Sequence, residues 1–262
     1  APHYTKAGAF PISQFIAPLF ESMSVGTLII FERAFWWLHI AGILVFMNYL
    51  YFSKHLHILL AFPNTYFADL NPKGKFDNLE SVTKEVKLMM DPNADPFAAP
   101  APDADAAPTK FGTNDVQDLN WVQLLNAYTC TECGRCTSAC PANITGKKLS
   151  PRKIMMDTRD RMEEVGKNID ANKGVFVPDN KTLLNDYITP EELWACTSCN
   201  ACVEECPVNI SPLSIIMDMR RYLVMEQSAA PMSLNAMMTN VENNGAPWQY
   251  SQQDRLNWKN EN

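Results

Sequence analysis

The chain contains CTECGRCTSACP at residues 130–141 and CTSCNACVEECP at residues 196–207. Both stretches have the spacing Cys-x2-Cys-x2-Cys-x3-Cys-Pro, and together they use all 8 cysteines of the 262-residue chain. This is the ligand pattern of proteins that hold two 4Fe–4S clusters, in which each iron takes one thiolate. We therefore predict two such clusters.

In such a run, the fourth cysteine, the one before proline, typically ligates the other cluster. We therefore assign the first cluster to Cys130, Cys133, Cys136 and Cys206. The second cluster is assigned to Cys196, Cys199, Cys202 and Cys140. Zinc sites fit the pattern less well, because they usually take two CxxC pairs per metal rather than quartets that end in Cys-Pro. Disulfides fit less well because they need an oxidising compartment and rarely give two identical quartets.

The two halves of this region repeat beyond the cysteines. SPRKIMMDTR at residues 150–159 corresponds to SPLSIIMDMR at residues 211–220. Ser150 and Ser211 suit the N-cap of a helix, and the proline after each suits the first helical turn. Residues 141–195 are too many for a compact ferredoxin that contains strands. We therefore predict an all-α fold, in which a transmembrane helix precedes an α-helical ferredoxin domain with two clusters.

Residues 34–53, AFWWLHIAGILVFMNYLYFS, carry no formal charge. The stretch is long enough to span a hydrocarbon core of about 30 Å. Trp36 and Trp37 near one end, and Tyr49 and Tyr51 near the other, suit the two bilayer interfaces. The alternative is a buried helix of a soluble core.

The segments on both sides of this span are predicted as well. Residues 10–31 are apolar but are interrupted by Pro11, Pro18 and Glu21, so we expect an interfacial segment there. Pro63 is expected to end the spanning helix.

His39 and His57 are separated by five turns if one helix carries both, so their rings would share a face about 27 Å apart. This distance is close to the thickness of the hydrocarbon core, and imidazoles at these depths suit the axial ligation of two b-type haems. His55 would lie on the opposite face. The alternative reading makes His57 an interfacial residue and gives His39 a hydrogen bond to another helix. Each haem would also need a second histidine from a helix outside this chain.

The run FERAFWWLHIAGILVFMNYLYFSKHLHILLAFPN, residues 31–64, resembles the last membrane helix of the nitrate reductase gamma-type cytochrome b. In that family two histidines at this spacing each ligate one b haem, which implies this role for His39 near the outer surface and for His57 near the cytoplasm. From about residue 10 to residue 223, the chain resembles membrane-bound iron–sulfur oxidoreductases related to heterodisulfide reductase. The resemblance implies a soluble redox partner: a CCG-domain iron–sulfur protein, a flavoprotein or a dehydrogenase.

Four parts are expected along the chain. The first, residues 1–62, is the membrane segment, and the next, residues 63–110, is an amphipathic helix followed by a linker rich in Pro, Ala and Asp. The dicluster domain follows at residues 111–230 and a polar tail at residues 231–262. The chain begins with Ala1 rather than Met, so we expect either processing or a longer parent protein.

The composition and the absence of certain motifs exclude several classes of function. A net charge of −7 gives no basic face for nucleic acid. The sequence shows no Ser-His-Asp pattern, phosphate-binding loop or GxGxxG fingerprint, so its chemistry is expected in one-electron cofactors. We predict the electron-transfer subunit of a quinone-linked oxidoreductase. The alternatives are a membrane-tethered dicluster ferredoxin without haem and, more remotely, a structural zinc protein.

We expect the chain in the inner membrane, with its cluster domain on the cytoplasmic side. Cysteine-bound clusters suit a reducing compartment. Lys54, Lys73 and Lys75 follow the span, whereas Lys6 and Arg33 precede it, which agrees with the positive-inside tendency.

Overall fold

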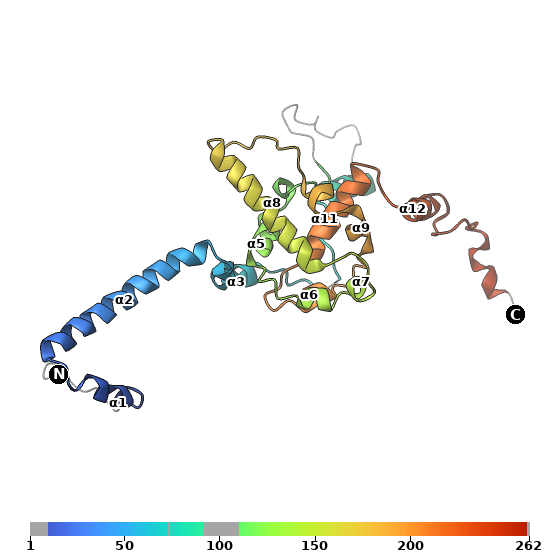
Figure 1. Ribbon diagram of the computed structural model, residues 1–262. Helices are drawn as coiled ribbons and strands as arrows, with labels where there is room; N and C mark the ends of the chain where they lie inside the picture. Colours follow the sequence, from blue (N-terminus) through green and yellow to red (C-terminus); the bar gives the residue numbers. More distant parts are fainter. Residues whose placement is uncertain (1–9, 73, 92–109, 261–262) are drawn as a thin grey trace. The chain divides into compact units, whose positions relative to one another are not determined.

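The computed structural model describes residues 10–72, 74–91 and 110–260. The residues described form helices and no strand, apart from one isolated bridge between Leu184 and Ile188. The chain divides into two compact units, Ala1–Leu56 and His57–Asn262 (Figure 1). The predicted helical class is confirmed for the described residues, whereas residues 92–109 of the predicted linker lie outside them. The predicted domain boundaries stay predictions.

The first unit contains α1 (Ser13–Ile16), the 3-10 turn η1 (Ala17–Phe20) and the long helix α2 (Val25–Tyr51). Among the described residues, α2 is the one helix long and apolar enough to cross a membrane, and its most apolar window is fully exposed. This exposure argues against the alternative of a helix buried in a soluble core.

Helix α2 begins earlier than the sequence predicts. Ser24 is its N-cap, and the backbone N–H of Thr27 donates to Ser24 Oγ at 3.2 Å. A capping serine satisfies an N–H group that the first helical turn leaves without a partner. Residues 25–31 of the predicted interfacial segment therefore belong to α2, and the membrane position of residues 10–31 stays a prediction.

His39 and His57 do not share a helix, so the five-turn argument is wrong. Helix α2 ends at Tyr51, and His57 begins a separate helix, α3 (His57–Tyr66), after the short turn η2 (Lys54–Leu56). Ser53 lies in the break: its Oγ donates to Leu50 O at 3.2 Å and accepts from the backbone N–H of His55 at 3.2 Å. Serine bonds of this kind compete with helical hydrogen bonds.

Pro63 does not end a helix but lies inside α3. Proline removes one N–H from the helix, yet the turn is completed because the backbone N–H of Phe67 donates to Pro63 O at 3.0 Å. Helix α3 therefore continues to Asn64 and beyond.

The second unit is built from short and long helices joined by loops. In chain order after α3, its elements are α4 (Glu80–Met90), η3 (Val116–Asp118), α5 (Trp121–Thr129), α6 (Arg135–Ser138), α7 (Pro141–Ile144), α8 (Pro151–Ala171), η4 (Leu183–Tyr187), α9 (Pro190–Ala195), α10 (Ala201–Glu204), α11 (Pro212–Met225), α12 (Met232–Asn244) and η5 (Asp254–Lys259). Figure 1 shows α8 and α11 side by side at the centre of this unit. Fully buried side chains of these two helices, such as Ile154, Ile215 and Met219, form the core.

The predicted N-caps are confirmed at the start of both long helices. Ser150 Oγ accepts from the backbone N–H of Lys153 and Ser211 Oγ from that of Ser214, each at 3.3 Å. Because a cap fixes where a helix begins, these two serines set the point at which each cysteine loop ends.

Arg161 of α8 is fully buried and joins three segments of the second unit. Its Nη2 donates to Asp115 Oδ2 at 2.7 Å, to Asp179 Oδ1 at 3.0 Å and to the carbonyl of Lys181 at 2.7 Å. Hydrogen bonds from this guanidinium lower the pKa of Asp179 to about 2. Two carboxylates thus pair with the buried charge of Arg161.

We expect Arg161→Ala to lower the free energy of unfolding by about 3–5 kcal/mol, because it leaves Asp115 and Asp179 without their buried partner. Urea unfolding of the complete chain in detergent, followed by circular dichroism, measures the change. The control is Lys167→Ala on the same helix, whose exposed pair with Glu163 spans 3.9 Å and contributes at most about 0.5 kcal/mol. Equal losses in the two variants would contradict this prediction.

Candidate iron–sulfur site

The two cysteine loops have the same backbone design. Cys130 is the C-cap of α5 and Cys196 is the C-cap of α9, both with extended backbone angles. Two positions later in each loop, Glu132 and Ser198 adopt positive φ values of 59° and 57°. Repeated left-handed residues turn the chain tightly, which lets the cysteines that follow face back toward the first one.

The first predicted thiol set meets around one cavity. A cavity of about 60 Å³ is lined by Cys130, Cys133 and Cys136 of the first loop and by Cys206 of the second. Cys202 also reaches its wall. The structure therefore brings the fourth cysteine of one quartet to the first three of the other, as the crossed assignment predicts; the ligation itself stays a prediction.

The second thiol set is also assembled across the two loops. Cys196 is close enough to Cys140 and Cys199 for their charges to interact, and so is Cys202. Cys202 also interacts with Cys136, so the two thiol sets are neighbours. Cys140 thus interacts electrostatically with cysteines of the second quartet.

Burial disfavours the ionised form of these thiols. Burial, together with neighbouring cysteines, raises the pKa of Cys202 to about 12. Burial also raises the pKa values of Cys130, Cys136 and Cys196. A bound metal deprotonates its thiol ligands and stabilises the thiolates, so these sites couple iron binding to folding.

Backbone N–H groups are directed at the sulfurs. Ser198 N donates to Cys196 Sγ at 3.4 Å, and Ile210 N donates to Cys206 Sγ at 3.3 Å. Such hydrogen bonds stabilise a thiolate and help to set cluster potentials. The thiols and their donors therefore fit 4Fe–4S clusters.

In the part of the chain that the structure describes, no group of three or more His, Cys, Asp or Glu side chains could hold a metal ion. A 4Fe–4S cluster distributes its four thiolates over four irons, so its ligands do not meet at a single ion.

Two arginines beside the site were not predicted. Arg220 donates to the carbonyls of Leu193 and Cys196, and its counterpart Arg159 pairs with Glu132 at 2.8 Å. The two occupy the same final position in SPRKIMMDTR and SPLSIIMDMR, and this repeated arginine was the signal that could have identified them.

Asn64 of α3 is a further residue that the sequence analysis missed. Its side chain is buried, and its Nδ2 donates to the carbonyl of Val208 at 2.7 Å. Val208 follows Cys206 by two residues, so α3 is fastened to the loop that carries this cysteine.

The predicted haem ligands lie in different units. His39 lies in α2, where it lines a hollow with Phe35, Leu38 and Gly42. His57 is the first residue of α3 in the second unit. The described chain therefore gives each histidine its own helix.

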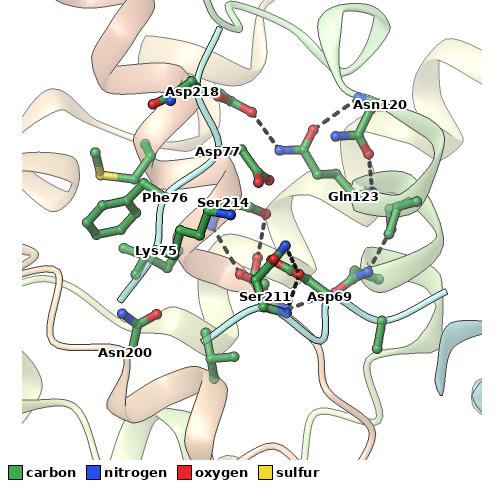
Figure 2. Close-up of a pocket in the computed structure, with 18 of the residues that line it drawn as sticks. Asp69, Lys75, Phe76, Asp77, Asn120, Gln123, Asn200, Ser211, Ser214 and Asp218 are labelled. Atoms are coloured by element: carbon green, nitrogen blue, oxygen red, sulfur yellow. Dashed lines mark hydrogen bonds between the residues drawn. The ribbon is translucent and has the colours of Figure 1, made fainter. Parts of the chain in front are cut away.

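A larger cavity of about 790 Å³ lies between residues 67–80 and helices α5 and α11. Figure 2 shows Gln123 between Asn120 and Asp218 in its wall. Gln123 Nε2 donates to Asp218 Oδ2 at 2.7 Å, and its Oε1 accepts from Asn120 N at 3.0 Å. None of the eight cysteines lines this cavity, and Gln123 serves there to join α5 to α11.

Sequence similarity to known iron–sulfur proteins agrees with these cysteine sites. Residues 129–210 match the 4Fe-4S dicluster domain family. The chain is 31% identical over 281 residues, 96% of this chain and 36% of the relative, to a probable iron-sulfur-binding oxidoreductase, FadF, of Bacillus subtilis. It is 30% identical over 278 residues to the EtfAB:quinone oxidoreductase of Syntrophomonas wolfei, covering 98% of this chain and 35% of that protein. The chain thus spans about a third of the length of these two relatives.

Shorter relatives cover the cluster region. A probable membrane-anchored ferredoxin of Chromohalobacter salexigens is 35% identical over 171 residues, 60% of this chain and 25% of the relative. One polypeptide of a CoB-CoM heterodisulfide reductase of Methanosarcina acetivorans is 32% identical over 108 residues, 41% of this chain and 52% of that polypeptide. The predicted resemblance to heterodisulfide reductase is confirmed in this coarser form. Residues 129–210 therefore match a 4Fe–4S dicluster domain, and the chain is similar to iron–sulfur oxidoreductases over most of its own length.

Proposed function

We propose that this chain is the membrane-bound electron-transfer part of a quinone-linked oxidoreductase, which links quinone and haem b to a soluble redox partner through two 4Fe–4S clusters. The observation that carries the proposal is the meeting of Cys206 with Cys130, Cys133 and Cys136 around one cavity. Similarity to an EtfAB:quinone oxidoreductase supports the link to quinone. The soluble partner is a CCG-domain iron–sulfur protein, a flavoprotein or a dehydrogenase.

Each proposed cluster is assigned to one set of four cysteine thiols. The first cluster takes Cys130, Cys133, Cys136 and Cys206. The second takes Cys196, Cys199, Cys202 and Cys140. When bound, these clusters supply one-electron transfer. The chain provides the thiols, the backbone donors to sulfur and partial burial, with Cys133 and Cys199 exposed at the surface.

His39 and His57 are each proposed to ligate one b haem, with the second axial ligands from helices outside this chain. An ionisable side chain in a membrane helix is costly and usually functional, which supports a role for His39. Gly42, one turn farther along α2, adds no side chain to the hollow around His39 and leaves room beside the imidazole. His57 stands at the start of the helix that Asn64 fastens to the Cys206 loop.

The second candidate function is a membrane-tethered dicluster ferredoxin without haem. Similarity to a probable membrane-anchored ferredoxin favours it. In that protein α2 would serve only as an anchor, and the two histidines would be structural.

We expect Cys206→Ser to remove the cluster of the first loop, because Cys206 lines the cavity of that loop. Iron content and EPR spectra of the complete chain measure the loss. Cys140→Ser is the matched control and should remove the other cluster. Loss of only the second-loop cluster in Cys206→Ser would disprove the crossed assignment.

We expect His39→Ala to remove one haem absorption band and leave both clusters intact, because this residue ligates a haem and no iron–sulfur cluster. His57→Ala should remove the other haem and stop electron transfer between quinone and the clusters. The measurements are a redox-difference optical spectrum and quinone-dependent cluster reduction in the intact membrane complex. His55→Ala is the control and should change neither. An unchanged haem count in both the His39 and the His57 variants would favour the tethered ferredoxin.

The cluster domain is proposed to face the cytoplasm, where thiolate-bound clusters persist. A C-terminal fusion to alkaline phosphatase should therefore be inactive, and a C-terminal fusion to green fluorescent protein should fluoresce. Activity of the phosphatase fusion alone would place the domain on the other side of the membrane.

A further inference from the structure

The two cysteine sites share a plan but differ in charge. Arg135 and Arg152 of the first half correspond to Ala201 and Leu213 of the second half. The second half carries Glu204 where the first has Ser138. The two sites can therefore be compared directly, because their loops have the same backbone conformation but different charged residues.

Both arginines lie at the first site. Arg135 and Arg152 line the cavity formed by Cys130, Cys133, Cys136 and Cys206. Arg152 Nη1 lies 3.7 Å from the position that a Cβ on Gly134 would take, so this guanidinium packs over the cysteine loop itself. Both side chains are exposed at one end, and salt screens part of their charge.

Other charges near the sites reduce this difference but do not reverse it. Arg159 at the first site is paired with Glu132, whereas Arg220, its counterpart, bonds neutral carbonyl groups and keeps a positive charge beside Cys196 at the second site. The acidic residue Glu204 shares a hollow with Cys199 on the second loop. Glu205 is exposed in the turn between Cys202 and Cys206.

Reduction adds one negative charge to a cluster, and nearby cations stabilise that charge. The first site has Arg135 and Arg152 in its wall, whereas the second has one arginine, Arg220, and the acidic neighbour Glu204. We propose that the cluster of Cys130, Cys133, Cys136 and Cys206 has the higher reduction potential of the two, set by Arg135 and Arg152. One electron then passes from the reduced second-site cluster to the oxidised first-site cluster, and no proton moves. This inference rests on the proposed function only in requiring a cluster at each site.

EPR-monitored potentiometry of the intact membrane complex tests the proposal. Cys133→Ser and Cys199→Ser assign the signals, because each removes a cysteine of only one set. We expect the first-site cluster to have the higher potential. In the double variant Arg135→Ala with Arg152→Leu, which copies the second half, the first-site potential should fall. The expected loss is about threefold to tenfold in the reduction equilibrium per arginine, where tenfold corresponds to about 59 mV for one electron.

Two matched variants separate charge from packing. Arg135→Lys keeps the charge and should largely keep the potential. Ala201→Arg adds the missing charge to the second site and should raise the potential of the second-site cluster alone. A first-site potential at or below the second, or an equal shift of both clusters in the double variant, overturns the inference. A wild-type complex that holds fewer than two clusters overturns both the inference and the proposed function. If two clusters are present but neither reduction potential changes in the arginine variants, only the inference is overturned.

Discussion

The exchange of one cysteine between the two loops is the constraint on which the second unit depends. Cys206 reaches the cavity of the first loop, and the charge of Cys140 interacts with Cys196 of the second quartet. Neither site can be completed unless both loops are positioned together. The buried helices α8 and α11 meet this requirement, because each begins at a serine cap shortly after its own cysteine quartet. The packing of the core therefore determines the geometry of both cysteine sites.

The parts of the fold that could be predicted from the sequence are those with a local cause. The caps at Ser150 and Ser211 are confirmed, because the capping groups lie beside the turns that they fix. The bonds of Arg161 to Asp115 and Asp179 join residues far apart in sequence, and no short pattern reveals them. The prediction of one helix carrying both His39 and His57 failed because the polar residues 53–55, SKH, lie between two apolar helices, and Ser53 makes hydrogen bonds at the break.

The two halves of the repeat differ at one backbone carbonyl, and in the second half helix α3 bonds to it. In the first half, the carbonyl of Ala142, two residues after Cys140, accepts from the backbone N–H of Lys147. Lys147 belongs to the segment TGKKL, residues 145–149, which has no counterpart in the second half. At the equivalent place in the second half, the carbonyl of Val208 accepts from Asn64 of α3 instead. A helix from the N-terminal part of the chain thus replaces a local turn, and it does so beside the cysteine that completes the first site.

This replacement gives the two sites different neighbours. Asn64 is about 10 Å along α3 from His57, at 1.5 Å per residue. The first site is thus tied by a part-buried hydrogen bond to α3, and it is also the site whose wall holds Arg135 and Arg152. Under the proposed function, the site beside α3 is therefore the one proposed to have the higher reduction potential, so an electron on the second site would move to it.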